Sequence, residues 1–291
     1  MKMLRWLILT ALIACLLCAC GAPAEEASPE TTAPVQVTEP QQEETTEPPT
    51  EPPTEPPVDV ARELIREGNY ADAATVLTDV EGDEAQMLRL RAELGDVAVG
   101  DEIGFGRFEQ DNDLDNGPEQ IQWIVIGKEE DKVLLLSKYC LDNQPFHSKN
   151  GAVTWEESLM RTWLNGEFCN AAFTAPEQML LEETELVNTD NPRYETPAGE
   201  NTMDRVFLLS FEEVDTYLTR TQCCAQVTAY ADARDCYNNA SGYAYWWLRS
   251  PGVYSRDAMY VAPNGEYSLY GYVVNRYRWT VRPAVWVDLS V

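Results

Sequence analysis

The sequence predicts one α+β domain, residues 96–291, behind a short helical unit and an extended stalk. Two observations support this fold class. From residue 96 the apolar residues follow the period of β-strands, and strand patterns rich in aromatic residues return after residue 242. Between these two regions lie several helix-start signals. Strands, then helices, then strands again make a single domain of antiparallel strands and helices.

The first residues of the chain predict a secretory signal. Lys2 and Arg5 precede an apolar run over residues 6–17, which is too short to span a membrane comfortably. Residues 17–20, Leu-Cys-Ala-Cys, resemble the bacterial lipobox. The resemblance implies that residues 1–20 are a lipoprotein signal peptide and that Cys20 is diacylated. The protein would then be anchored to the outer face of the cytoplasmic membrane; an ordinary signal with a stray cysteine is the alternative.

Residues 21–57 have a composition that cannot bury a core. They contain ten prolines, nine glutamates and no lysine or arginine, and they end in three copies of Thr-Glu-Pro-Pro. Proline at this density favours polyproline II, at about 3.1 Å per residue, and like-charge repulsion extends the chain further. We expect a disordered stalk with a reach of about 100 Å, which suits the crossing of a cell wall.

The charge of the chain excludes some partners. Its formal net charge is −28, so it lacks the cationic surface that supplies most nucleic-acid affinity. Anionic lipid headgroups would also repel it. We therefore expect no nucleic acid as a partner and attachment to the membrane through the lipid only.

The cysteines of the exported part match no metal-binding spacing. These residues are Cys140, Cys169, Cys223, Cys224 and Cys236. Five thiols cannot all pair within one chain. Because the exterior is oxidising, we expect one or two disulfides, with Cys236 joined either to Cys223 or to Cys224.

Residues 58–95 predict two or three short helices, since Val60, Leu64 and Ile65 recur at helical spacing. The stretch resembles the middle of a tetratricopeptide repeat in the placement of Gly68, Tyr70, Ala73 and Leu77. Stacked repeats usually need about three units to bury a continuous core. We therefore expect a spacer docked on the next domain, with a peptide-binding groove as the alternative.

Strand patterns open the domain and close it. The first set is an antiparallel meander over residues 102–108, 121–127 and 132–139. The later strands are expected at 206–210, around Trp246 and Trp247, at 257–262 and at 281–289, with a hairpin turn at 263–266.

The connection after the first strand looks like a calcium loop because Asp111, Asp113 and Asp115 alternate in it. The match fails at two positions. Gly117 falls one place late, and Gln122 stands where a bidentate glutamate is required. We predict a solvated hairpin loop and no metal site.

Three capping boxes mark helix starts between the two sets of strands. They pair Thr154 with Glu157, Thr174 with Glu177, and Ser210 with Glu213. The predicted helices cover residues 155–168, 175–187 and 211–219, with a short one near 228–236, so the domain would hold about four helices.

Several motifs resemble an uncharacterised domain family of exported Gram-positive proteins. They are TWEESLMRTWLN at 154–165, WWLRSPG at 246–252 and VRPAVW at 281–286, with IQWIVI and VLLLSKYCLD before them. The resemblance covers residues 96–291.

The order of the late motifs is also similar to the C-terminal half of C-type-lectin-like domains, including the formylglycine-generating group. A Trp strand ending in Arg-Ser is followed by a loop-rich segment with an Asn-Gly turn and by a strand with Val-Arg. The sequence departs from that pattern at Thr280, where glycine is usual. The resemblance implies a single C-type-lectin-like domain.

Arg249 and Arg282 stand in strongly aromatic segments. In an extended strand Trp247 and Arg249 share one face and Trp246 the other, which indicates a strand buried on both sides. We interpret Arg249, Arg282, Trp247 and Trp286 as structural.

A guanidinium at such a place needs carboxylate or carbonyl partners, which Glu156, Glu157 or Asp288 could supply. We interpret Arg161, between Trp155 and Trp163, in the same way. A ligand-binding or catalytic arginine is the alternative.

Enzyme signals are weak. A formylglycine-generating type would place a reactive cysteine pair near the end of the chain, and no cysteine follows Cys236. His147 is the sole histidine, which excludes multi-histidine iron sites, and no Gly-x-Ser-x-Gly motif is present. Glycosidase chemistry needs only two carboxylates, and the chain has 49 acidic residues. We predict no catalytic residues and no cofactor.

A binding module is the better interpretation, because the segment 252–279 is rich in tyrosine and short polar residues, a composition that resembles a paratope. The candidate ligand-binding residues are Tyr254, Arg256, Asp257, Tyr260, Asn264, Tyr267, Tyr270, Tyr272, Tyr277 and Trp279. Tyr267, Tyr270, Tyr272 and Tyr277 are expected to face outward from an irregular loop. Alternatively, the tyrosines cover the loop's own core.

The sequence thus predicts a cell-surface lipoprotein whose non-catalytic domain binds a surface glycan or a protein. A structural protein of the cell envelope and a diverged enzyme of the formylglycine-generating type are the alternatives.

Overall fold

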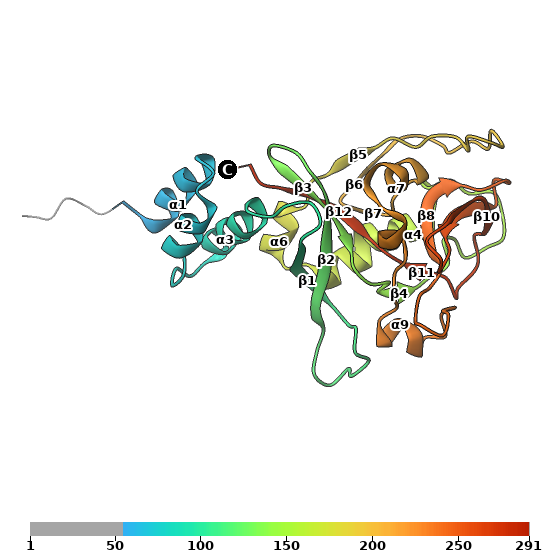
Figure 1. Ribbon diagram of the computed structural model, residues 1–291, viewed down its shortest axis with the longest axis horizontal. Helices are drawn as coiled ribbons and strands as arrows, with labels where there is room; N and C mark the ends of the chain where they lie inside the picture. The colour runs from blue at the N-terminus through green and yellow to red at the C-terminus, as the bar shows by residue number, and fades with distance from the viewer. Residues whose placement is uncertain (1–54, 291) are drawn as a thin grey trace, which may run out of the picture. The chain divides into compact units, whose positions relative to one another are not determined.

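The computed structural model describes residues 55–290 (Figure 1). The predicted signal peptide, Cys20 and almost all of the predicted stalk lie outside the described residues. Within the described part, no helix has the length and apolar character needed to cross a membrane. The fold is α+β with antiparallel sheets, as the sequence predicts.

Three helices precede the sheets: α1 (Pro57–Arg66), α2 (Tyr70–Val76) and α3 (Asp83–Gly95). They share a small apolar core that includes Ile65, Leu77 and Leu88. α3 also contacts the domain that follows, where the Lys128 ammonium donates to the carbonyl oxygen of Gly95 at 2.7 Å. The helical unit therefore packs on the next domain, and its role as a spacer stays a prediction.

The first sheet is fully antiparallel, in the order β1-β2-β3-β12-β7. Its strands are β1 (Glu102–Phe108), β2 (Glu119–Lys128), β3 (Lys132–Ser137), β12 (Ala284–Asp288) and β7 (Val206–Phe207). The predicted meander forms its first half. The C-terminal strand β12 pairs with β3 on one side and β7 on the other, so elements distant in sequence close the sheet (Figure 1).

The second sheet has the order β10-β9-β8-β11-β4. Its strands are β10 (Tyr267–Val273), β9 (Asp257–Val261), β8 (Trp246–Pro251), β11 (Thr280–Val281) and β4 (Asp142–Asn143). Only the pair β8 and β11 is parallel among its contacts. β5 (Thr184–Leu186) and β6 (Thr202–Asp204) form a separate antiparallel ribbon.

The chain crosses between the two large sheets at Arg282 and Pro283. The sequence predicts one strand over residues 281–289, but β11 ends at Val281 in the second sheet and β12 begins at Ala284 in the first. Proline has no N–H to donate, so it ends one ladder before the next begins. The Pro283 carbonyl accepts the N–H of Ser137 at 2.9 Å, at the end of β3.

Seven short helical segments lie between the strands. They are α4 (Leu159–Trp163), the π-helical turn η1 (Leu164–Phe168), α5 (Cys169–Ala172), α6 (Ala175–Leu180), α7 (Phe211–Tyr217), α8 (Arg220–Cys223) and α9 (Ala229–Ala233). The capping boxes at Thr174 and Ser210 are confirmed, and Thr219 with Gln222 forms another. The predicted start at Thr154 is wrong, because the N-cap of α4 is Ser158.

The predicted helix over 175–187 is too long. It ends at Leu180, and residues 184–186 form β5. Glu182 N–H donates to the carbonyl oxygen of Trp286 at 2.9 Å, and Leu181 forms a bridge with Val287. Because residues 181 and 182 pair with β12, the helix ends after its first turns and the chain continues as an extended segment.

The core of the domain is one apolar cluster that reaches both large sheets. Every residue of β8 is buried, which confirms that this strand is covered on both faces. Trp123, Trp155, Trp246 and Trp247 are among its largest fully buried side chains. Large aromatic residues of this kind contribute most of the buried apolar area in a core.

Candidate functional site

The segment 252–279, predicted as an irregular loop, is mostly the β9–β10 hairpin. The expected turn at 263–266 joins the two strands, and the Ala262 N–H donates to the backbone carbonyl oxygen of Glu266 at 2.8 Å. β10 carries a bulge between Ser268 and Tyr272. Gly271 occupies it with φ at +68°, and a Cβ there would come within 2.6 Å of the Ala258 carbonyl oxygen, so only glycine fits.

Four of the candidate tyrosines are exposed. The exposed fractions are 59% for Tyr254, 58% for Tyr270, 38% for Tyr272 and 61% for Tyr277. Tyr267, expected to face outward, instead turns toward α7. Its hydroxyl donates to Asp215 at 2.8 Å, and burial together with Asp215 raises its pKa to about 12.

Trp279 is buried at the centre of an aromatic cluster and is not itself a contact surface. Its ring centroid lies 4.2 Å from that of Tyr260, 4.5 Å from Trp247, 4.9 Å from Tyr272 and 5.3 Å from Tyr245. Only 5% of Trp279 is exposed. The cluster therefore fixes the rings of Tyr260 and Tyr272 from below.

Arginines lie against the exposed tyrosine rings. The guanidinium of Arg256 is 5.3 Å from the ring centroid of Tyr254, and that of Arg276 is 4.9 Å from Tyr272. Arg276 also donates to the Tyr272 hydroxyl at 2.9 Å. Cation–π contact orients each guanidinium without neutralising it.

No pattern in the sequence indicated a third pair, Arg193 and Tyr194. This pair lies about 60 residues before the hairpin in sequence but beside it in space. The guanidinium of Arg193 is 5.4 Å from the Tyr194 ring centroid, and that ring is 5.1 Å from Tyr270. Among the described residues, Arg193, Arg256 and Arg276 form no ion pair with a carboxylate. We call this set the tyrosine–arginine surface: Arg193, Tyr194, Tyr254, Arg256, Tyr270, Tyr272, Arg276 and Tyr277.

Asn191 holds the upstream loop to the hairpin. This side chain is 1% exposed, and its amide donates to the carbonyl oxygens of Leu269 at 2.8 Å, Pro251 at 2.9 Å and Gly252 at 3.2 Å. Its Oδ1 accepts the N–H groups of Arg193 and Tyr194. One buried residue thus fixes the backbone of both segments that carry the surface.

Two predicted contact residues lie apart from this surface. Asp257 is buried in β9, and desolvation, its largest influence, raises its pKa. Asn264 shapes the hairpin turn, since its Oδ1 accepts the N–H of Glu266 at 3.1 Å. Neither side chain belongs to the tyrosine–arginine surface.

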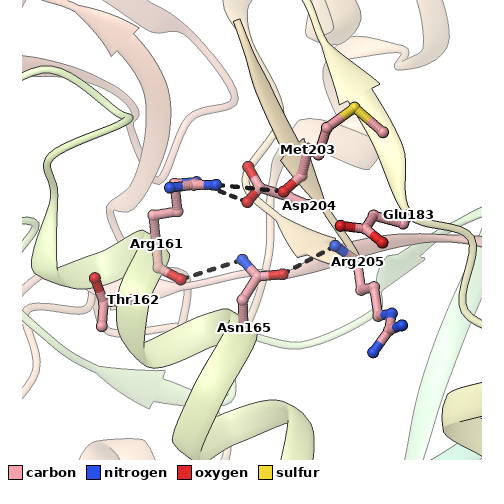
Figure 2. A pocket seen from close by; sticks show the side chains of 7 residues that line it. All are labelled: Arg161, Thr162, Asn165, Glu183, Met203, Asp204 and Arg205. Atoms are coloured by element: carbon pink, nitrogen blue, oxygen red, sulfur yellow. Dashed lines mark hydrogen bonds and ion pairs between the residues drawn. The ribbon is translucent and has the colours of Figure 1, made fainter.

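A polar pocket of about 270 Å³ lies elsewhere, between α4 and β6 (Figure 2). It is lined by Arg161, Thr162, Asn165, Glu183, Met203, Asp204 and Arg205. Asn165 lies between Arg161 and Arg205 in Figure 2: its amide donates to the Arg161 carbonyl at 3.1 Å, and its Oδ1 accepts the Arg205 N–H at 2.9 Å.

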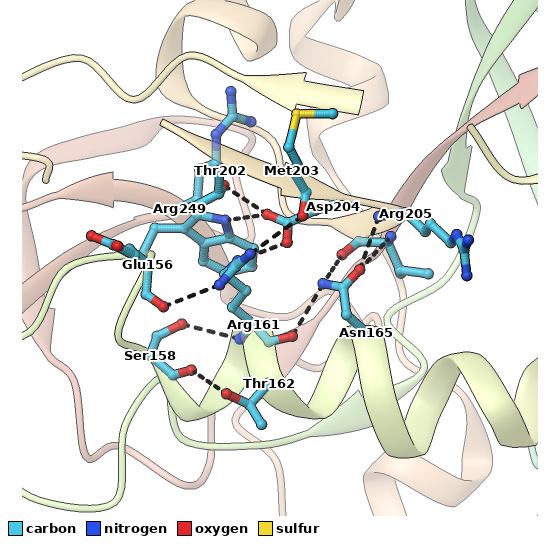
Figure 3. Close-up of polar contacts among 12 residues, drawn as sticks. Glu156, Ser158, Arg161, Thr162, Asn165, Thr202, Met203, Asp204, Arg205 and Arg249 are labelled. Atoms are coloured by element: carbon cyan, nitrogen blue, oxygen red, sulfur yellow. Dashed lines mark hydrogen bonds and ion pairs between the residues drawn. The ribbon is translucent and has the colours of Figure 1, made fainter. Parts of the chain in front are cut away.

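The polar groups at the back of this pocket are satisfied by one another (Figure 3). Arg161 Nε donates to Asp204 Oδ1 at 2.6 Å, and the other carboxylate oxygen accepts Trp155 Nε1 at 2.9 Å and the Thr202 hydroxyl at 2.7 Å. A buried carboxylate with three donors holds α4 against β6. Arg161 forms an ion pair with the buried Asp204 and not with Glu156, Glu157 or Asp288, and we assign this network a structural role.

Arg249 forms a buried ion pair, but not with the expected residues. Its guanidinium donates to both carboxylate oxygens of Glu213, to Oε1 at 2.8 Å, and to the Leu208 carbonyl at 2.9 Å. Glu156, Glu157 and Asp288 take no part. The partner lies on α7 because β8 runs beside the segment that leads into that helix, where Arg249 N–H donates to Leu209.

Arg282 is 1% exposed and has no carboxylate partner among the described residues. Nε donates to the Ser137 carbonyl at 2.8 Å and Nη1 to that of Gln222 at 2.7 Å. The expectation of a carboxylate such as Asp288 is wrong here, because Arg282 lies at the crossing between the sheets, where backbone carbonyls surround it. Trp286, also predicted as structural, is buried in β12, where the Lys132 ammonium lies 4.9 Å from its ring centroid.

The loop after β1 gathers carboxylates, though not the set that the calcium-like spacing suggested. Oxygen atoms of Glu109, Asp111 and Glu119 lie within 4.8 Å of one another, without Asp113 or Asp115. Glu119 Oε2 already accepts the N–H groups of Gln110 at 2.7 Å and of Asp111 at 3.2 Å. The Glu119 carboxylate therefore holds the backbone at the start of this loop, which explains why the carboxylates lie close together.

The expected disulfides are absent from the described residues. Cys140, Cys169, Cys223, Cys224 and Cys236 are all free thiols, and only Cys224 is not fully buried. Cys223 and Cys236, one of the two expected pairs, are not bonded to each other. Cys140, Cys169 and Cys223 lie in the apolar cluster of the domain and behave as small apolar core residues.

Comparison with known proteins gives a family without an activity. No curated protein and no solved structure matched the chain. Residues 130–289, which include the WWLRSPG and VRPAVW motifs and cover more than half of the chain, match the family described as Domain of unknown function (DUF6273). The chain belongs to this family of uncharacterised domains, as the motifs predicted.

Proposed function

We propose that the domain is a non-catalytic module that binds a glycan through the tyrosine–arginine surface. One observation carries the proposal: exposed tyrosine rings lie beside arginines that form no ion pair with a carboxylate among the described residues. Tyr270 and Tyr272 lie on β10, Tyr254 lies just before β9 and Tyr277 just after β10, and all four offer exposed rings and hydroxyl groups. Flat aromatic faces suit the apolar faces of sugar rings, and the arginines can donate to sugar hydroxyl oxygens.

Rigidity supports a binding role. Asn191 fixes the backbone of both segments, and the Trp279 cluster fixes Tyr272 from below. Ordering a flexible side chain on binding costs about 0.5–1.5 kcal/mol each. A surface whose rings are already in place avoids much of that cost.

The rest of the proposal concerns where the domain is displayed. The lipobox-like Leu-Cys-Ala-Cys, with Cys20 as its last residue, and the Pro/Glu/Thr-rich stretch after it support a lipoprotein held at the outer face of the cytoplasmic membrane. A stalk of that composition would carry the domain outward toward cell-wall polymers. Surface glycan is the ligand class within its reach.

A C-type-lectin-like fold stays part of this proposal. It is supported by the order of the Trp-Trp-Leu-Arg-Ser strand, the Asn-Gly hairpin turn and the Val-Arg strand, and by the parallel contact between β8 and β11 that joins the first and last of them. Binding of a glycan would agree with that likeness.

The test is an array of glycans and cell-wall fragments, probed with the exported chain lacking the lipid. We expect the domain to bind a glycan on the array, and this binding to depend on the tyrosine–arginine surface. Binding to protein fragments alone would show that the ligand is a protein. No binding at all would favour a structural role in the envelope.

A further inference from the structure

Arg282 is a buried cation without a counter-charge among the described residues. The guanidinium can donate five hydrogen bonds. It forms two, to the carbonyl oxygens of Ser137 and Gln222, and its centre lies 5.1 Å from the ring centroid of Trp246. Arg249, at the equivalent junction of β8 with α7, has a full carboxylate partner in Glu213. The charge of Arg282 is therefore not neutralised by a carboxylate, and its guanidinium has N–H groups left to donate.

Isolated buried charge is unfavourable, since desolvation is repaid only by a close partner of opposite sign. Desolvation lowers the pKa of Arg282 to about 10, and the nearby groups of possible negative charge are the thiols of Cys140, Cys223 and Cys224. Burial raises the pKa of two of these, that of Cys140 to about 11, so they are neutral at pH 7. The site lacks an anion.

Arg282 is 1% exposed, and it is among the residues that line a pocket of about 220 Å³. The pocket is lined by Ile124, Lys138, Tyr139, Thr221, Gln222, Cys224, Gln226, Tyr243 and Arg282. Its two charged lining residues, Lys138 and Arg282, are both cations, although the chain as a whole carries −28. Lys138 is paired with Glu102 at 2.7 Å, which leaves a net positive pocket around Arg282.

We infer that this pocket binds a small oxyanion, a carboxylate or a phosphate group, whose charge neutralises Arg282. The anion would accept from the free N–H groups of Arg282 and from the Lys138 ammonium, with the Thr221 hydroxyl and the Gln226 amide as neutral donors at the pocket wall. This inference goes beyond the proposed glycan-binding function, because the tyrosine–arginine surface contributes no residue to the pocket.

The test measures thermal unfolding of the full exported chain in sodium chloride, sodium acetate and sodium phosphate at equal ionic strength and pH 7. A ligand that binds only the folded state raises the midpoint in a saturable way. We expect a saturable rise with phosphate, with acetate, or with both, over chloride. The salt that produces it distinguishes a phosphate site from a carboxylate site.

Two variants separate site binding from the general effect of excluded salts. Gln226→Glu places a carboxylate in the pocket, so it should raise the midpoint in chloride and abolish the extra rise in phosphate or acetate. Asn170→Asp adds the same charge at an exposed position outside the pocket and should keep the rise. Lys138→Gln, in which Arg282 stays intact, should weaken anion binding by about fivefold.

The inference is overturned if chloride, acetate and phosphate give equal midpoints. It is equally overturned if Gln226→Glu shows the same rise of the unfolding midpoint in phosphate or acetate as the parent. If Gln226→Glu is instead less stable than the parent in chloride, the inference is overturned when Lys138→Gln binds the anion as tightly as the parent.

Discussion

Arg249 donates to both carboxylate oxygens of Glu213, and the same carboxylate closes the capping box of α7 by accepting the N–H of Ser210 at 2.8 Å. One side chain therefore serves the helix end and the buried guanidinium together. Arg249 belongs to the second sheet and also donates to Leu208, which follows β7 of the first sheet. The pair joins α7 and both sheets.

Arg249→Met should lower the free energy of unfolding by about 3 kcal/mol, because it leaves the Glu213 carboxylate without its charged partner. Arg220→Met is the matched control. Its ion pair with Glu266 is more than half exposed on both sides, so the change should cost less than about 1 kcal/mol. Urea titration of both variants measures the difference. Equal, small costs for the two would show that Arg249 does not hold the fold together.

The thiols should react in a fixed order. Among the five in the described part, Cys224 alone is partly exposed, while burial raises the pKa of the buried ones, that of Cys140 to about 11. An alkylating reagent at pH 7 should therefore modify Cys224 first and the others only in denaturant, as read by peptide mass spectrometry. Cys224→Ser should remove the fast reaction. Thiols that stay unmodified in denaturant until a reductant is added would show disulfides.

Tyr267 should make stability fall at alkaline pH. Its pKa is raised from 10.0 to about 12, so the folded state keeps a proton that the unfolded chain loses between these values. This contribution is fully present below pH 10 and is lost as the pH rises toward 12. Tyr267→Phe should be less stable than the parent at pH 8, by about 1 kcal/mol for the lost hydrogen bond to Asp215. The gap should narrow from pH 10 upward in denaturant titrations; a constant gap would show that Tyr267 titrates normally.

Cys20→Ala should release the protein into the medium, because the variant lacks the residue that would carry the lipid. Fractionation of cells and mass analysis of the N-terminal peptide check this outcome, with Cys18→Ala as the control that keeps the acceptor. A Cys20→Ala protein that stays in the membrane fraction, or a parent peptide without lipid mass, would remove the proposed anchor.

Local signals in the sequence predicted much of the fold. Thr174 with Glu177 and Ser210 with Glu213 carry complete capping boxes, and both helices begin there. Thr154 with Glu157 has the same spacing but starts no helix. Trp155 is drawn into the core and donates to Asp204, about 50 residues away, so tertiary contact overrides the local pattern.

The binding surface was only partly predictable for the same reason. The tyrosines of the hairpin were visible by composition, but the register of β10 against β9 shifts between Ser268 and Tyr272, around Gly271, and this irregularity sets which rings face outward. Arg193 and Tyr194 join the surface through Asn191, a contact between distant segments. The position of β12 between β3 and β7, and with it the open pocket at Arg282, likewise depends on pairing over more than 70 residues.

We propose that the exposed tyrosines bind a glycan and do not support the fold. The decisive measurement compares the parent with a variant in which Tyr254, Tyr270, Tyr272 and Tyr277 are replaced by serine, by thermal unfolding and by binding to the glycan retained on the array. Leu114→Ser with Met179→Ser is the control, because these exposed apolar residues lie outside the hairpin. We expect the tyrosine variant to unfold at a midpoint temperature within about 5 °C of the parent and to lose binding. The control should still bind the glycan. A tyrosine variant that binds as the parent does, or that loses binding only because it unfolds, would contradict this proposal.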